Sequence, residues 1–162
     1  MDDLTIERLL SGPAREALLP LLLEADESEP EVRGYMQAGD LYVLRAAGGD
    51  APLGVTLAIP LPNEPDTVEL KAVAIAPNQQ NRGLGKRMLA LALADLRERG
   101  ARRAIVGTSN AGIGQIAFYQ KAGFRLWRIE PDFFTPERGY DPDSRENGIQ
   151  HRDMVWMDQA LG

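Results

Sequence analysis

Residues 80–86, which read Gln-Asn-Arg-Gly-Leu-Gly-Lys, have the composition of an anion-binding turn. An apolar segment typical of a strand precedes them at residues 68–75, and residues 84–99 have the composition of a strong helix. Glycine lets the main chain approach a ligand closely, and the free N–H groups of a helix N-terminus point toward an anion. The segment therefore predicts a site for a ligand that carries a phosphate or pyrophosphate.

Two nucleotide-binding motifs fail to account for this segment. A P-loop requires glycine where the chain has Gln80 and a hydroxyl residue where it has Arg87, so the Mg²⁺ ligand would be missing. A Rossmann turn requires a small residue where the chain has Met88. Residues 112–117 match the Rossmann pattern by letters, but residues 108–111 separate them from the preceding strand and too little chain follows for a dinucleotide half-fold.

The pattern that remains is Gln80-x-x-Gly83-x-Gly85 between a strand and a long helix. It resembles the pyrophosphate loop of the GNAT superfamily of acetyl-coenzyme A-dependent N-acetyltransferases. Residues 69–77 resemble the fourth strand of that family, and residues 110–124 resemble its fourth helix and the strand that follows. The resemblance covers residues 68–129, whereas residues 1–60 match only in the order of elements. Residues 132–134, 146–149 and 152–154 resemble a bacterial subgroup of unknown substrate.

The resemblance implies two catalytic residues, Glu69 and Tyr119. An alkyl amine with a pKa of ~10.4 is mostly protonated at pH 7, which costs roughly 4–5 kcal/mol before it can attack a thioester. Glu69 stands at the position of the family's glutamate base, and either its carboxylate or an ordered water would accept the proton. Tyr119 matches the general acid. A phenol is a weaker acid than a thiol, so we expect a hydrogen bond to the leaving thiolate, with late proton transfer.

The resemblance also implies which residues bind the cosubstrate. The main chain of Val73 and Ile75 would pair with the pantetheine arm, between strands that splay apart beside the loop. Asn110 would bond the arm from the other side. The full set of expected cofactor-binding residues is Val73, Ala74, Ile75, Gln80, Asn81, Arg82, Gly83, Leu84, Gly85, Lys86, Asn110 and Tyr119.

Other residues that could do chemistry have less context. His151 is the only histidine, and we interpret it as a structural or surface residue because it lies outside the cofactor segment. Phe133, Phe134 and Tyr140 belong to a long loop expected at residues 131–150. They could form a lid over the substrate or simply pack the loop.

Composition restricts the class of protein. The 162-residue chain has a formal net charge of −6, which argues against nucleic acid as the main partner. It contains no cysteine, which excludes disulfides, zinc–thiolate sites and thiol nucleophiles, so we expect neither a metal nor a covalent enzyme intermediate. The N-terminus lacks a signal-peptide pattern and no apolar run approaches the ~20 residues that span a bilayer, so we expect a cytoplasmic protein without membrane contact.

The elements expected from hydrophobic periodicity define the fold. Strands are expected at residues 4–10, 41–46, 53–59, 68–75, 104–106, 124–129 and 153–157, helices at 13–23, 29–37, 84–99 and 112–121, and a loop at 60–66. They predict an α/β, GNAT-like single domain over residues 1–162, with a mixed seven-stranded central sheet and about four helices on both faces.

The function expected is direct transfer of the acetyl group of acetyl-CoA to a primary amine of a small molecule or peptide. Acidic stretches at residues 24–31 and 130–146 flank a basic centre at residues 82–103, which suggests a cationic acceptor beside a polyanionic cosubstrate. The alternatives are a non-catalytic acyl-CoA-binding regulatory module and acyl transfer to a hydroxyl. The family resemblance also allows a homodimer.

Overall fold

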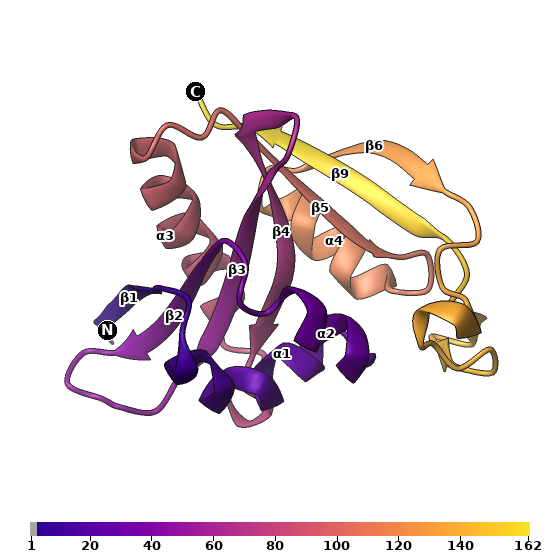
Figure 1. The fold of residues 1–162 in the computed structure, drawn as a ribbon, viewed down its shortest axis with the longest axis horizontal. Coiled ribbons are helices and arrows are strands. Elements are labelled where there is room, and N and C mark those ends of the chain that lie inside the picture. Colours follow the sequence, from indigo (N-terminus) through magenta and orange to yellow (C-terminus); the bar gives the residue numbers. More distant parts are fainter. Residues whose placement is uncertain (1–2) are drawn as a thin grey trace.

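A seven-stranded mixed sheet forms the centre of the computed structural model, which describes residues 3–162 (Figure 1). The spatial order is β1 (Leu4–Leu9), β2 (Asp40–Ala46), β3 (Gly54–Leu61), β4 (Glu64–Ile75), β5 (Arg103–Ser109), β9 (Met154–Ala160) and β6 (Arg125–Glu130). Only β4 and β5 pair in parallel; the other neighbours in the sheet are antiparallel. This is the mixed seven-stranded sheet expected from the sequence.

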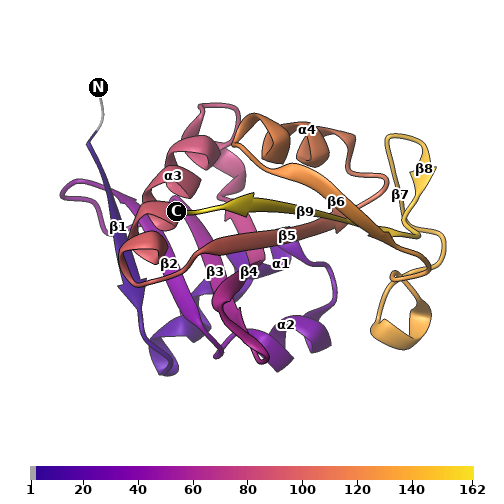
Figure 2. The same ribbon diagram turned by 90° about the horizontal axis from the view of Figure 1, so that it is seen from above.

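Helices cover both faces of the sheet, as predicted (Figure 2). The short helices α1 (Leu19–Ala25) and α2 (Glu29–Tyr35) pack on one face, where Leu22 and Val32 are fully buried against β2, β3 and β4. The longer helices α3 (Leu84–Glu98) and α4 (Ile113–Lys121) pack on the other face, with Leu89 at the centre of a second core. The sheet therefore separates two cores.

The expected helix at residues 13–23 is divided in the structure. It begins as a 3₁₀ helix, Pro13–Leu18, and the α-helix starts only at Leu19. Pro20 lies in the first turn of α1, where its missing N–H would have no helical acceptor, so a new helix can begin there but the earlier one cannot run through.

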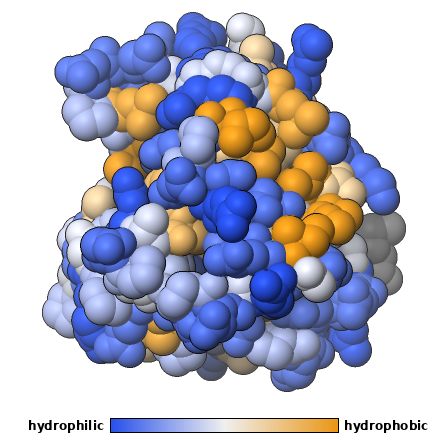
Figure 3. Space-filling view, turned by 90° about the vertical axis from the view of Figure 1, so that its right-hand side faces the viewer, coloured by the Kyte–Doolittle hydropathy of each residue, from blue (hydrophilic) through white to orange (hydrophobic). Residues whose placement is uncertain are grey.

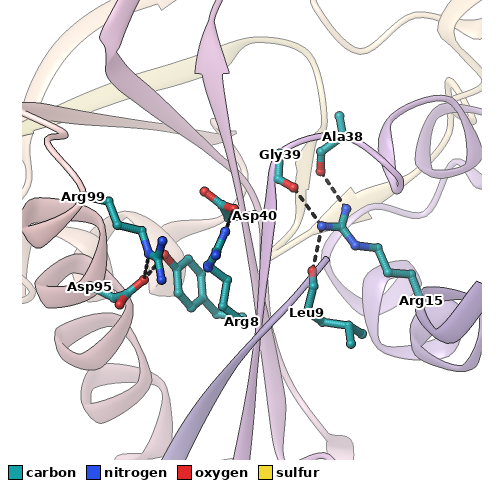
Figure 4. A network of polar contacts seen from close by, with 9 residues as sticks. Arg8, Leu9, Arg15, Ala38, Gly39, Asp40, Asp95 and Arg99 are labelled. Carbon is teal, nitrogen blue, oxygen red and sulfur yellow. Dashed lines mark hydrogen bonds and ion pairs between the residues drawn. The ribbon is translucent and has the colours of Figure 1, made fainter. Parts of the chain in front are cut away.

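A buried arginine holds this 3₁₀ helix against the sheet (Figure 4). The Arg15 side chain is fully buried, and its guanidinium donates hydrogen bonds of 2.7–3.0 Å to four main-chain carbonyls. These carbonyls belong to Leu9, Met36, Ala38 and Gly39. Burial lowers the pKa of Arg15 from its ordinary value. The arginine ties the end of β1 to the α2–β2 connection.

The expected loop at residues 60–66 is wrong. β3 extends to Leu61 and β4 begins at Glu64, so a tight hairpin joins them. The prolines misled the prediction: Pro60 pairs with Val68, and the register shifts between Pro60 and Leu61. A strand tolerates proline at such an irregularity, because the proline nitrogen is not required to donate a ladder hydrogen bond there.

A second irregularity, a bulge at Lys71, changes the face that β4 presents. Ala58 pairs with Leu70 and Leu57 pairs with Ala72, which leaves Lys71 as the extra residue. Leu70 accordingly belongs to the core under α3 and α4, whereas Ala72 belongs to the core under α1 and α2. In a regular strand these two side chains would share a face.

The expected loop at residues 131–150 also contains regular structure. It holds a 3₁₀ turn, Pro136–Arg138, and a two-stranded hairpin of β7 (Arg145–Glu146) and β8 (Ile149–Gln150), at the right of Figure 2. Asn147 and Gly148 join the two strands with φ of 54° and 74°. Asn-Gly is the preferred sequence for such a turn, because both residues tolerate positive φ.

Candidate active site

A cavity of about 300 Å³ passes between β4 and β5, and residues from both faces of the sheet line it. The pairing of these strands ends at Leu70 and Val106, so residues 71–75 and 107–109 part from each other. Along its other edge β5 pairs with β9 over its whole length, from Arg103 to Ser109. No described strand pairs with the edge of residues 71–75 that faces β5. Splayed strands beside the loop are what the family resemblance implied for the pantetheine arm.

The loop at residues 80–86 lies at the end of β4 and leads directly into α3. Asn81 and Gly83 both have positive φ, 66° and 73°, which turns their main chain into the left-handed region before the helix. Gln80 donates a side-chain hydrogen bond of 3.1 Å to the carbonyl of Ile75, which holds the loop against the strand. Since the first N–H groups of a helix lack helical acceptors, this end of α3 can bind an anion.

Two glycines serve the loop differently. A Cβ on Gly83 would meet no atom within 4 Å, so its left-handed backbone is what favours glycine there. A Cβ on Gly85 would lie 3.2 Å from the ring of Phe118 on α4, so glycine allows α3 and α4 to approach. Arg82 and Lys86 are exposed and add positive charge beside the loop.

Tyr119 contributes a buried hydroxyl to the cavity. Its ring packs edge-on against Phe118 and Phe124, with centroids 5.2 and 5.8 Å away. Within residues 3–162 the hydroxyl has no hydrogen-bond partner, and burial raises the pKa of Tyr119 well above its ordinary value. The phenol is therefore a neutral donor available to a ligand in the cavity.

Glu69 lies in the wall of the same cavity. Its side chain is 20% exposed, and its carboxylate is 3.7 Å from the ammonium of Lys71. Lys71 in turn lies over the ring of Tyr35, 5.2 Å from its centroid. Glu69 and Lys71 are two residues apart in β4, so their side chains lie beside each other on one face of the strand.

Comparisons with known proteins agree with this geometry. Residues 9–124 match the family model described as Acetyltransferase (GNAT) family. The chain belongs to the GNAT acetyltransferase family. An uncharacterized N-acetyltransferase of Bacillus subtilis, YvbK, is 40% identical over 155 residues, which cover 96% of this chain and 95% of the relative.

Solved GNAT structures share the whole fold. A Bacillus subtilis acetyltransferase in complex with CoA is 38% identical, with a TM-score of 0.85 over 99% of this chain and all of the other. A GNAT acetyltransferase from Elizabethkingia anophelis with acetyl-CoA bound is 30% identical, with a TM-score of 0.83 over 99% of each chain. The predicted fold and family are confirmed, and this GNAT chain is an acetyl-CoA-dependent acyltransferase.

In the structure the side chain of Asn110 forms hydrogen bonds with the segment before β9, which the sequence did not predict. Its Nδ2 donates to the carbonyl of Gln150 at 3.2 Å, and its Oδ1 accepts from the N–H groups of Arg152 and Asp153 at 2.9 and 3.0 Å. Asn110 is also not part of the cavity wall. Its side chain anchors the segment before β9, and a contact with the pantetheine arm stays a prediction.

His151 lies in the cavity wall of this GNAT chain, although the sequence suggested a structural or surface residue. Its Nδ1 is 2.6 Å from Ser109 Oγ, and its Nε2 is 3.8 Å from Glu146 Oε1. Sequence reasoning missed this site residue. No local signal marked it, because its position depends on the antiparallel pairing of β5 with β9, which brings the residues just before β9 next to the end of β5.

The aromatic residues of the 131–150 segment close one side of the cavity. Phe134 packs against Phe133 and Tyr140, with ring centroids 5.1 and 4.9 Å away. The hydroxyls of Tyr140 and Tyr35 donate to the two carboxylate oxygens of Asp26, at 3.1 and 3.0 Å. The segment therefore packs onto the α1–α2 connection across the cavity. The end of the molecule that carries it is largely hydrophilic, with hydrophobic residues gathered in patches (Figure 3).

Two further findings concern membrane-spanning helices and metal ligands. In residues 3–162 no helix is long and apolar enough to cross a membrane. The same residues contain no group of three potential metal-ligating side chains.

Proposed function

We propose that residues 1–162 act as one domain that transfers the acetyl group of acetyl-CoA directly to a primary amine of a small molecule or peptide. The observation that carries this proposal is that the buried residue Tyr119, whose hydroxyl has no described partner, lines the same cavity as Glu69. The two groups enter the cavity from different faces of the sheet. Donor and acceptor can therefore meet between them.

The donor side fits a coenzyme A ligand. Main-chain N–H groups of residues 80–86 would hold the pyrophosphate at the start of α3, with Arg82 and Lys86 adding charge. The edge of residues 71–75 that β5 leaves free offers main-chain groups to the pantetheine amides. This arrangement would bring the thioester toward the Tyr119 hydroxyl.

The acceptor side favours a cation. One lysine and five carboxylate residues line the cavity, the carboxylates being Glu24, Asp26, Glu27, Glu69 and Glu146. Asp26 receives two phenolic hydrogen bonds and no described cation pairs with it. Aromatic rings stand beside these carboxylates, and an ammonium group is attracted to both.

The chemistry balances with groups in the cavity. The ammonium loses a proton to a group in the wall, a role that the resemblance gives to Glu69. The N–C bond then forms as the C–S bond breaks. The sulfur keeps the electron pair and receives a hydrogen bond, then a proton, from Tyr119. The base releases the first proton before it takes the second from the amine, one of these two protons restores the Tyr119 phenol through solvent, and the net reaction releases one proton.

A screen of amines for CoA release tests the proposal. Polyamines, aminoglycosides, amino acids and peptides with a free N-terminus are offered with acetyl-CoA, and free thiol is measured against a sample without amine. We expect turnover with at least one cationic amine and its acetylated product by mass spectrometry. CoA release that is the same with and without every amine would contradict amine transfer.

A further inference from the structure

We propose that His151 is the group that takes the proton from the acceptor amine, with Ser109 and Glu146 as its positioning residues; this rests on the proposed amine transfer. His151 is the only histidine of the chain, and its side chain is 19% exposed in the wall of the cavity that holds Tyr119 and Glu69. The ring therefore borders the same cavity in which the acceptor amine would lie.

The contacts of Ser109 bear on which ring nitrogen of His151 carries the proton. Its Oγ accepts from the N–H of Ala111 at 3.1 Å, donates to Asn110 Oδ1 at 3.4 Å, and lies 2.6 Å from His151 Nδ1. The orientation of the Asn110 amide is fixed, because two main-chain N–H groups of the 150–153 segment donate to Oδ1. A hydroxyl has one proton, so all three contacts are hydrogen bonds only if Nδ1 donates to Ser109.

The other nitrogen, Nε2, then keeps a lone pair. It lies 3.8 Å from Glu146 Oε1, a distance at which the carboxylate forms an ion pair with the ring once Nε2 has gained a proton. Imidazole is the side chain whose ordinary titration range lies nearest neutral pH, which suits a general base. The proton leaves the amine nitrogen for Nε2 and then passes to solvent, which restores the neutral ring.

Glu69 has a different neighbourhood. Its carboxylate lies beside the Lys71 ammonium, whereas His151 Nε2 faces a carboxylate. We assign to Glu69 the electrostatic attraction of the ammonium and to His151 its deprotonation. The charged or titratable groups in the cavity wall around the ring are Glu146 from β7, Glu69 and Lys71 from β4, Tyr119 from α4, Tyr140 from the 131–150 segment, Glu24 from α1, and Asp26 and Glu27 after it.

The tautomer can be measured without knowing the acceptor. The protein, prepared without a histidine tag and with ¹⁵N-labelled histidine, gives one ring in a long-range ¹H–¹⁵N correlation spectrum. We expect the neutral ring to carry its proton on Nδ1, and Ser109→Ala to remove that preference. A neutral wild-type ring protonated on Nε2 would overturn the proposal.

Kinetics test whether the ring acts as a base. Propylamine is mostly protonated at pH 7, whereas hydroxylamine is mostly neutral and needs little help from a base. We expect His151→Gln to lower kcat with propylamine by about 10²–10⁴-fold and to affect hydroxylamine far less, with unchanged CoA affinity. The exposed neighbour Arg152→Gln is the control. Glu69→Gln should mainly raise the KM for propylamine.

The outcomes separate this inference from the proposed function. If the wild type turns over propylamine and the His151→Gln variant is equally active, the role of His151 is overturned and amine transfer is not. The same conclusion follows if the variant loses the same factor in kcat with propylamine and with hydroxylamine. A wild-type protein inactive with every amine overturns amine transfer itself. Added imidazole should restore part of the activity of His151→Gly, and absence of this rescue in a variant that still binds CoA would also contradict the proposal.

Discussion

Replacing Gly83 by aspartate should weaken coenzyme A binding more than a hundredfold without unfolding the protein. A Cβ at this position meets no atom within 4 Å, so the protein has room for the new side chain. The left-handed backbone, with φ of 73°, costs about 1 kcal/mol for a residue other than glycine, and aspartate and asparagine bear it best. The loss of stability should therefore be small.

The loss of affinity should be much larger. A carboxylate about 5 Å from one phosphate charge, at an effective dielectric constant of about 20, repels it by roughly 3 kcal/mol, or more than a hundredfold in Kd. Gly83→Asn is the matched control, since it has the same shape and backbone preference without the charge. The difference between the two variants isolates the electrostatic cost at the loop.

Isothermal titration calorimetry with CoA measures this difference, and urea unfolding checks the stability of each variant. Pantetheine, which lacks the pyrophosphate, should bind both variants about equally. The difference in CoA affinity between the aspartate and asparagine variants should become smaller at high salt, because exposed charges are screened. Equal CoA affinity for the two variants would refute the assignment of the pyrophosphate to residues 80–86.

Three further predictions follow from buried side chains. Tyr119→Phe should lower kcat by about 10-fold or more with little change in CoA affinity, because it removes only the hydrogen bond to the leaving thiolate; an unchanged kcat would remove Tyr119 as the acid. Arg15→Met should cost about 3 kcal/mol or more in urea unfolding, because it leaves buried carbonyls unpaired, whereas the exposed Arg33→Met should cost under about 1 kcal/mol. Burial raises the pKa of all four tyrosines, so above pH ~10 they ionise in the unfolded chain before they ionise in the folded protein. The free energy of unfolding should therefore fall with rising pH, by up to about 1.4 kcal/mol per pH unit for each tyrosine. A free energy of unfolding that stays constant to pH ~11 would contradict this.

Local patterns were enough to predict most of the fold. The loop at residues 80–86 was placed correctly between a strand and a helix, and the helices expected at residues 84–99 and 112–121 agree with α3 and α4 to within one residue at each end. The mixed sheet with helices on both faces followed from the order of these elements. Each of these features depends on neighbours in the sequence.

Features that depend on distant pairing were not predictable in the same way. The bulge at Lys71 is defined only against β3, and it decides which groups of β4 reach the cavity. His151 and Ser109 meet through the pairing of β5 with β9 and the fold of the 131–153 segment. The exception is Asn147-Gly148, a local hairpin signal within a stretch that was expected to be a loop because of its prolines and glycines.

The location of coenzyme A tests the central claim most directly. A second groove, of about 490 Å³, runs between α3, α4 and the end of β9, and Lys86, Arg97 and Lys121 give it positive charge. A crystal structure of the complex with CoA decides between the two places. We predict the pantetheine arm between β4 and β5, the pyrophosphate on residues 80–86, and the sulfur within hydrogen-bonding distance of the Tyr119 hydroxyl. Pantetheine in the α3–α4 groove, or a sulfur out of reach of Tyr119, would contradict the mechanism.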